Sequence, residues 1–263
     1  MQTSWALPEL AGRVVISPLA GGANNVNLKL AVPARSFVLK LRDRKGVPAS
    51  NARIQEAIQG QGLAHSLGVS PAILAASADG DFLSEFVTGK TLRPEIIRSD
   101  GYAPAMVIAL QKLHRVPPPD RHFRLDDDIR TFMVGATAVG AALPQGFDRL
   151  LQLAHELNGI IVASAAPVTF IHADLVPQNF IASDKGVVLV DFDYCGRGLT
   201  AIDIAGATSQ AEMDDAETDA FMRLYDPDLD DAQRVRVKCV QFINAIREVA
   251  WALMAEATIG AAA

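Results

Sequence analysis

Cysteine is nearly absent from this chain of 263 residues, which contains only Cys195 and Cys239. Two cysteines cannot form a disulfide framework in a chain of this length, and neither lies in a CxxC or Cys/His spacing typical of zinc sites. We therefore expect two reduced thiols, which is the usual state in a cytoplasmic protein.

The sequence also lacks a long hydrophobic run, and a secretory leader is not expected. The longest apolar stretch, residues 159–171, is interrupted by Ser164 and Pro167 and is too short to cross a bilayer. Residues 1–5 do not place a basic region before an apolar segment, as a signal peptide does. We expect a cytoplasmic protein without a membrane partner.

Basic residues are fewer than acidic residues, with 24 Lys and Arg against 30 Asp and Glu. The formal net charge is −6 and the pI is about 5.4. A nucleic-acid partner is therefore not expected. Hydrophobic residues make up 50% of the chain, which is sufficient for one large domain or two lobes. The composition leaves the oligomeric state open.

Two polar motifs stand out against this apolar background. His172, Asp174 and Asn179 form an H-x-D-x-x-x-x-N pattern, and an apolar run soon afterwards ends in Asp191, two residues before Asp193. Phosphoryl-transfer sites use a carboxylate that receives a hydroxyl proton, together with an amide and a second carboxylate that bind metal.

Hydrophobic periodicity predicts a β-rich first third and a mainly helical remainder. The expected strands are residues 12–18, 28–32, 36–42, 72–75 and 82–86. The expected helices are residues 51–67, 102–115, 127–141, 147–163 and 229–257. We predict an α+β bilobal chain, with a small antiparallel β lobe at residues 1–86 and a larger helical lobe at 87–263.

The order of these parts resembles the aminoglycoside phosphotransferase and choline kinase family, which has a protein-kinase-like fold. The segment 190–196, followed by Asp203-Ile204-Ala205, is similar to the family's IDFEYAG…DLA pattern. Two departures are visible: the Gly21-Gly22 turn does not spell GxGxxG, and the usual Gly-Asp-Pro reads Gly198-Leu199-Thr200.

The resemblance implies roles for the motif residues. Asp174 becomes the catalytic base, although an isolated loop aspartate more often makes a turn or a cap. Asn179 and Asp191 become Mg²⁺ ligands, since Mg²⁺ prefers oxygen donors. Asp193 either adds a metal contact or supports the other ligands, and His172 is expected to fix the loop by hydrogen bonding.

The resemblance also implies an ATP site in the first lobe. Lys40 is expected at the α- and β-phosphates, with Glu56 as its partner unless the phase of the helix presents Gln55 instead. Val38 shares the Lys40 face of its strand and would cover the adenine. The remaining nucleotide contacts are expected from the backbone, at Gly21, Gly22, Glu85 and Val87.

For the acceptor, the best clue is the segment 242–251, which resembles the C-terminal helix of choline-kinase-like proteins. Glu248 and Trp251 are three residues apart and fit one helical face, where an aromatic ring would attract an ammonium group. The alternative is that Trp251 packs in the core and Glu248 is solvated. Eight acidic residues at 214–231 are interpreted as helix starts or solvated faces, or as an attraction for a cationic acceptor.

The sequence thus favours an ATP- and Mg²⁺-dependent kinase acting on a small alcohol that is expected to be cationic. Choline or ethanolamine ranks first, and thiamine, an aminoglycoside or a sugar-like alcohol follows. The rivals are a catalytically inactive nucleotide-binding regulator and a metal-dependent hydrolase, and the latter leaves Lys40 unexplained.

Overall fold

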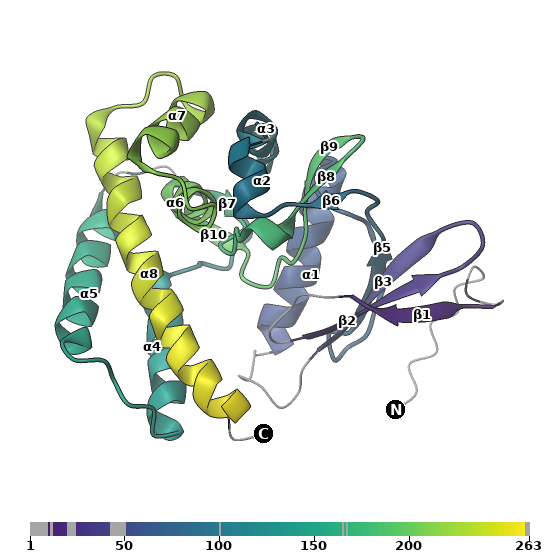
Figure 1. Ribbon diagram of the computed structural model, residues 1–263, viewed down its shortest axis with the longest axis horizontal. Coiled ribbons are helices and arrows are strands. Elements are labelled where there is room, and N and C mark those ends of the chain that lie inside the picture. Colours follow the sequence, from purple (N-terminus) through teal and green to yellow (C-terminus); the bar gives the residue numbers. More distant parts are fainter. Residues whose placement is uncertain are drawn as a thin grey trace.

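A computed structural model describes two lobes joined side by side (Figure 1). The described residues are Leu10, 13–19, 25–42, 51–99, 101–164, Ala166 and 168–260. The predicted phosphate-binding turn at Gly21 and Gly22 lies outside them. The expected α+β bilobal architecture is confirmed, whereas the exact lobe boundary at residue 86 stays a prediction.

The first lobe is a five-stranded antiparallel sheet in the order β1-β2-β3-β5-β4. Its elements are β1 (Val15–Pro18), β2 (Asn25–Ala31), β3 (Ser36–Arg42), β4 (Ile73–Ala76), β5 (Phe82–Glu85) and the helix α1 (Asn51–Ser66). The period-two pattern of β3 buries Phe37 against Leu30 and Leu83, because alternate side chains point to opposite faces of a strand.

The second lobe consists mainly of helices around two small sheets. The helices are α2 (Pro94–Ser99), α3 (Ala103–Leu113), α4 (Leu125–Ala138), α5 (Phe147–Ala163), α6 (Thr200–Gln210), α7 (Asp215–Tyr225) and α8 (Asp231–Gly260). The strands are β6 (Lys90–Thr91), β7 (Val168–Ile171), β8 (Phe180–Ser183), β9 (Gly186–Leu189) and β10 (Gly196–Leu199). Helix α8 runs along α4, α5 and α6 (Figure 1).

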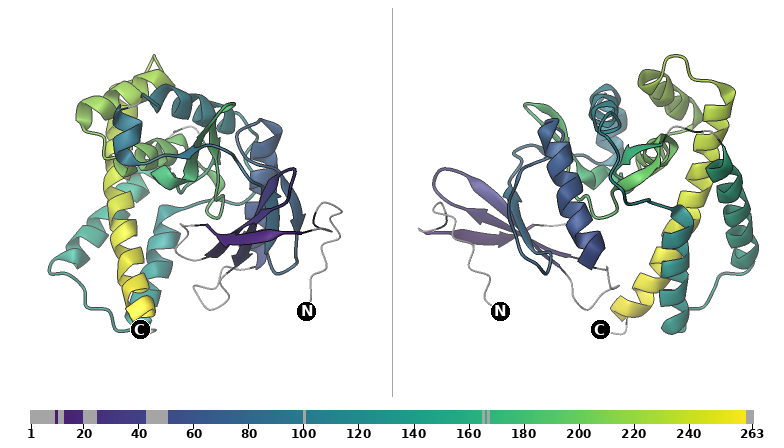
Figure 2. Two further views of the ribbon diagram at one scale, coloured as in Figure 1. Left: turned by 45° about the vertical axis from the view of Figure 1, so that its right-hand side comes forward. Right: turned by 180° about the vertical axis from the view of Figure 1, so that it is seen from behind.

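Helix α1 lies between the sheet and the helical lobe (Figure 2), in contact with β4 and β10. The two small sheets, β6-β8-β9 and β10-β7, carry the polar motifs toward this junction. The fold therefore brings β3 and the motif loops to the same interlobe region.

Three helices, α2, α6 and α7, were not expected from the sequence. Two of the acidic residues cap the start of α7. The Asp214 side chain accepts from the Glu217 N–H and the Glu217 side chain accepts from the Asp214 N–H, which forms a capping box. In the described part of the chain, no helix is both long and apolar enough to cross a membrane.

Candidate active site

The loop that carries Asp174 is held by a buried carboxylate. Asp203 of α6 is fully buried and accepts the backbone N–H groups of His172 and Ala173, each at 2.8 Å. Ala173 has a φ of 64°, a left-handed conformation that costs a non-glycine residue about 1–3 kcal/mol. The charge-assisted bonds from Asp203 offset this cost and so fix the backbone next to Asp174.

His172 supports the same loop. Its side chain is fully buried, with Nε2 at 2.9 Å from the Val190 carbonyl oxygen and the ring packed on Phe192. Burial lowers the pKa of His172 below its ordinary value, in spite of the nearby carboxylates of Asp203, Asp191 and Asp193. A neutral, hydrogen-bonded imidazole fits the structural role expected for this residue.

Asn179 ends the 3-10 turn η2 (Pro177–Asn179), and its amide orientation is set by a carbonyl. The Asn179 Nδ2 group donates to the backbone oxygen of Asp174 at 2.8 Å. Because a carbonyl oxygen only accepts, the oxygen Oδ1 must point the other way. Asn179 thus offers an oxygen ligand in the cavity that it shares with Asp191.

Asp191 and Lys40 meet across the two lobes. Lys40 of β3 is 4% exposed, and its Nζ lies 2.6 Å from Asp191 Oδ1 and 2.9 Å from Asp193 Oδ1. Burial lowers the pKa of Lys40, but the two carboxylates outweigh it and the pKa rises above its ordinary value. Lys40 therefore remains an ammonium cation at physiological pH.

The residues present fit a Mg²⁺ ion. Asn179 Oδ1 and the Asp191 carboxylate are two oxygen donors on one cavity, and Mg²⁺ usually takes one or two protein ligands and completes its shell with phosphates and water. Asp191 has a φ of 67°, so its position is also held against backbone strain, as at many functional sites.

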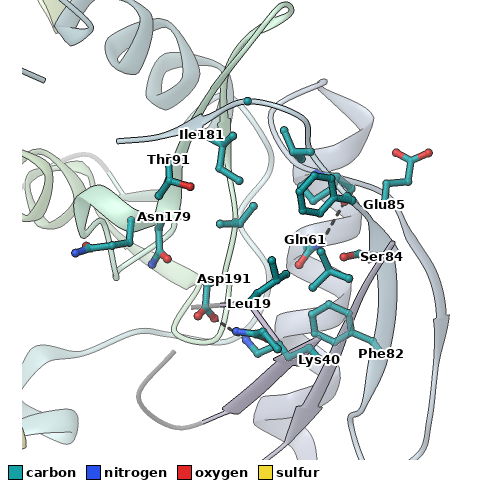
Figure 3. Close-up of a pocket in the computed structure, with 18 residues that line it drawn as sticks. Leu19, Lys40, Gln61, Phe82, Ser84, Glu85, Thr91, Asn179, Ile181 and Asp191 are labelled. Carbon is teal, nitrogen blue, oxygen red and sulfur yellow. Dashed lines mark hydrogen bonds and ion pairs between the residues drawn. The ribbon is translucent and has the colours of Figure 1, made fainter. Parts of the chain in front are cut away.

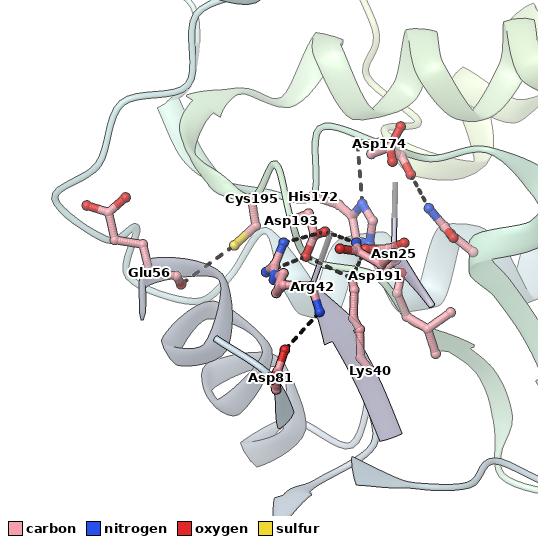
Figure 4. Close-up of polar contacts among 12 residues, drawn as sticks. Asn25, Lys40, Arg42, Glu56, Asp81, His172, Asp174, Asp191, Asp193 and Cys195 are labelled. Atoms are coloured by element: carbon pink, nitrogen blue, oxygen red, sulfur yellow. Dashed lines mark hydrogen bonds and ion pairs between the residues drawn. The ribbon is translucent and has the colours of Figure 1, made fainter. Parts of the chain in front are cut away.

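Asp193 is surrounded by donors (Figure 4). Arg42 binds it through two nitrogens at 2.8 and 2.9 Å, Asn25 Nδ2 donates at 3.0 Å, and Lys40 Nζ is the fourth donor nitrogen. Burial raises the pKa of Asp193, but Lys40 and Arg42 hold it below the usual carboxyl range. Four donor nitrogens from three residues use both oxygens of Asp193, which favours the supporting role over the metal-ligand role.

The expected Lys40–Glu56 pair is not formed, and this corrects the sequence interpretation. Glu56 Oε2 lies 3.3 Å from Arg121 Nε, while Lys40 is held by Asp191 and Asp193. The reason is the phase of α1, which presents Gln61 rather than Glu56 or Gln55 to the interlobe cavity.

A cavity of about 290 Å³ opens between the lobes (Figure 3). Lys40, Asn179 and Asp191 lie at one end, and the linker after β5 lies at the other (Figure 3). The lining also includes the expected residues Val38, Glu85 and Val87. The structure therefore gathers the described members of the predicted nucleotide set in one place, apart from Glu56.

The linker offers the Val87 N–H to this cavity. The N–H groups of Glu85 and Phe86 are already bonded to the carbonyls of Ala72 and Ser36, at 3.0 and 3.2 Å. Within the described chain, no backbone partner is formed by the Val87 N–H. Among residues 85–87, Val87 is consequently the one whose N–H is suited to donate to a ligand.

Sequence reasoning missed a charged cluster beside Asp174. Asp128 of α4 is 5% exposed and accepts from Arg53 of α1 at 3.0 Å and from Arg247 of α8 at 2.9 and 3.0 Å. Both guanidinium carbons lie 4.7 Å from the ring centre of Tyr194. Only the position of Tyr194, immediately after Asp193, gave a sequence signal for this cluster.

Glu248 and Trp251, the residues predicted to contact the acceptor substrate, differ in their exposure and in their neighbours. Glu248 is exposed and accepts from the Gln210 side chain of α6. Trp251 is half-buried and packs against the cluster of Phe132, Ala250 and Met254, which Tyr194 also touches. Trp251 is therefore on the Tyr194 side of α8, and contact with a substrate stays a prediction for both residues.

The protonation of Asp174 should appear in the pH profile. Burial raises the pKa of Asp174 to about 7, with Asp191 and Asp193 also raising it, while Arg247 and Lys40 lower it. If the carboxylate form is the active one, kcat/KM should fall about tenfold per pH unit below about pH 7.

Replacing Arg247 with glutamine should move this acidic limb to higher pH, because the cation that favours the carboxylate is lost. The measurement is kcat/KM from about pH 5 to about pH 9 for both proteins. A limb that stays in place, or that moves to lower pH, would exclude Arg247 as the group that tunes Asp174.

Comparison with known proteins places this chain in a family. The model of the phosphotransferase enzyme family matches residues 15–236. The protein LicA of Haemophilus influenzae is 22% identical over 212 residues, which cover 78% of this chain and 61% of LicA. A probable ethanolamine kinase of Arabidopsis thaliana is 27% identical over 148 residues, or 52% and 39% of the two chains. The chain thus spans less than two thirds of these relatives.

The fold is shared with a solved structure. The choline/ethanolamine kinase family protein from Mesorhizobium loti has a TM-score of 0.80 and 22% identity, with 97% of this chain and 85% of that chain covered. At this identity the likeness establishes the fold, while the family model covers most of the sequence. The chain therefore belongs to the phosphotransferase enzyme family.

Proposed function

We propose that this protein is an ATP-dependent small-molecule kinase that transfers the γ-phosphate to a hydroxyl group. The observation that supports this most directly is the convergence of Lys40, Asn179 and Asp191 on one interlobe cavity, with Asn179 bonded to the backbone of Asp174. Phosphoryl transfer depends mainly on positioning and on stabilisation of charge, and these residues supply both.

Each end of the cavity has its own task. The Val87 N–H donates to a ring nitrogen of the purine, and Val38 covers the base with an apolar surface. Lys40 donates from its ammonium to the phosphates. Mg²⁺ on Asn179 and Asp191 would neutralise the charge that develops on the transferred group.

Asp174 orients the acceptor hydroxyl and receives its proton. A base whose pKa lies near the working pH combines a useful fraction of carboxylate with a real affinity for the proton, and the pKa of Asp174 is about 7. Asp203 and Asn179 hold the loop on both sides of Asp174, so the carboxylate needs little reorganisation.

For the acceptor we favour an amino alcohol of the choline or ethanolamine type. The names of the relatives support this class. The ring of Tyr194 already has two guanidinium neighbours, so the aromatic face for an ammonium group would be that of Trp251. Thiamine and aminoglycoside-like or sugar-like alcohols remain the alternatives for the same site.

An acceptor screen tests the proposal. With Mg²⁺ and ATP, we expect choline or ethanolamine to stimulate ADP release well above that of thiamine, an aminoglycoside or buffer alone. The measurement is coupled ADP release, with ATP binding followed separately by calorimetry. ATP binding without acceptor-dependent ADP release would favour a regulatory module, and release of inorganic phosphate without phosphorylated acceptor would favour a hydrolase.

A further inference from the structure

We propose that Gln61 and Ser84 form a second polar contact for the nucleobase and select adenine over guanine. Both side chains line the wall of the interlobe cavity that lies across from Asn179 (Figure 3). This inference rests on the proposed function, because it assigns the nucleotide class that the same cavity binds.

The orientation of the Gln61 amide is fixed by its surroundings. Gln61 is 4% exposed, and its Nε2 donates to the Pro71 carbonyl at 3.1 Å. A carbonyl oxygen can only accept, so Nε2 faces Pro71 and Oε1 faces away from it. The Gln61 backbone oxygen accepts from the Ser70 hydroxyl at 2.9 Å, which holds this part of α1 in place.

The Gln61 Oε1 atom has no protein donor in the part of the chain that the structure describes. An acceptor on a cavity wall without a protein donor is available to a ligand that brings a donor, and a ligand without one leaves it unpaired once the cavity is filled. The cavity is the space that this side chain lines, so the donor is expected to come from the ligand.

Ser84 opens the way to Gln61. It occupies the penultimate position of β5, one residue before the linker, and is 4% exposed. A short hydroxyl side chain leaves the inner wall accessible, whereas a large residue there would cover Gln61. The Ser84 hydroxyl also has no described protein partner, so it adds a second polar group to the wall.

The two ends of this base site match adenine. The Val87 N–H needs an acceptor and Gln61 Oε1 needs a donor. Adenine offers a ring-nitrogen acceptor beside an exocyclic amino donor, whereas guanine offers a ring N–H beside a carbonyl oxygen. With guanine, donor would face donor and acceptor would face acceptor, and mismatched buried groups of this kind discriminate strongly.

Removing the 6-amino group from the ligand and the amide group from Gln61, separately and together, isolates the contact between them. The probes are ADP and purine riboside 5′-diphosphate, which lacks only the 6-amino group, and the measurement is the Kd of each by calorimetry. Wild-type protein should bind ADP about ten- to a hundredfold more tightly. In Gln61→Leu this preference should fall nearly to unity, because the acceptor is gone.

Gln59→Leu is the matched control, since Gln59 is an exposed glutamine on the same helix. It should keep the wild-type preference. An unchanged preference in Gln61→Leu, or equal binding of the two probes by wild-type protein, would overturn the inference while leaving the kinase proposal intact. Failure of wild-type protein to bind ADP at all would overturn both.

Thermal unfolding shows whether Gln61→Leu is folded. If the variant is not folded, the inference is tested on wild-type protein alone, by measuring the Kd of ADP and of GDP. ADP should bind at least about tenfold more tightly than GDP. Equal binding of ADP and GDP would overturn the inference.

Discussion

Asp174→Asn should lower kcat by about 10²- to 10⁴-fold, the usual contribution of a positioned general base. Asparagine keeps the size of the side chain but cannot accept the hydroxyl proton. The loop should keep its shape, because it is held through the backbone groups of His172, Ala173 and Asp174. ATP binding should therefore remain close to that of wild-type protein.

The two readouts for this variant are acceptor-dependent ADP release and the Kd of ATP. Asp184→Asn is a suitable control, because Asp184 is an exposed aspartate in the turn between β8 and β9. Unchanged turnover in Asp174→Asn would remove the base assignment. A weaker affinity for ATP, with kcat at saturating ATP equal to that of wild-type protein, would place Asp174 in nucleotide binding instead.

Lys40→Met should lower kcat/KM by about 10²- to 10³-fold, since an oriented donor to the developing charge is lost. The substitution should also destabilise the fold. It leaves Asp191 and Asp193 close together without their shared ammonium, and one broken buried pair typically costs about 3 kcal/mol or more. Asp191 is 27% exposed, so a value at the low end is expected.

The stability loss in Lys40→Met should depend on pH. Lys40 and Arg42 depress the pKa of Asp193, so this carboxylate stabilises wild-type protein above the unfolded-state pKa of about 3.9. That contribution disappears as the pH falls through the lower folded-state pKa. The difference in unfolding free energy between wild type and variant should therefore be larger at neutral pH than in acid.

Denaturant unfolding at two pH values and steady-state kinetics measure these effects. Lys185→Met removes an exposed lysine in the turn between β8 and β9 and serves as the control. A Lys40→Met protein with normal turnover would contradict the assignment of Lys40 to the phosphates. An equal stability loss in acid and at neutral pH would contradict the role of the ion pairs.

The parts that sequence predicted well are those set by short-range patterns. The strand at 36–42 is found with these bounds, because its alternation of apolar and polar residues has only one way to bury Phe37. The H-x-D-x-x-x-x-N spacing likewise places Asn179 where its side chain reaches the Asp174 backbone. Helix α6 was missed because it is buried on most sides, so no polar face marks it in the sequence.

The parts that sequence could not predict depend on how distant elements are oriented. The partner of Glu56 is decided by the rotation of α1 relative to the sheet, and Arg121 is its neighbour only in the folded chain. The cluster of Arg53, Asp128 and Arg247 joins three helices across both lobes. No spacing rule along one segment reports such contacts.

A structure of this protein with a non-hydrolysable ATP analogue and Mg²⁺ tests the central claim most directly. The account predicts the base against Val87, the phosphates at Lys40, and Mg²⁺ on Asn179 and Asp191, with Asp174 beside the terminal phosphate. Nucleotide bound outside the interlobe cavity, or metal held by other side chains, would contradict it.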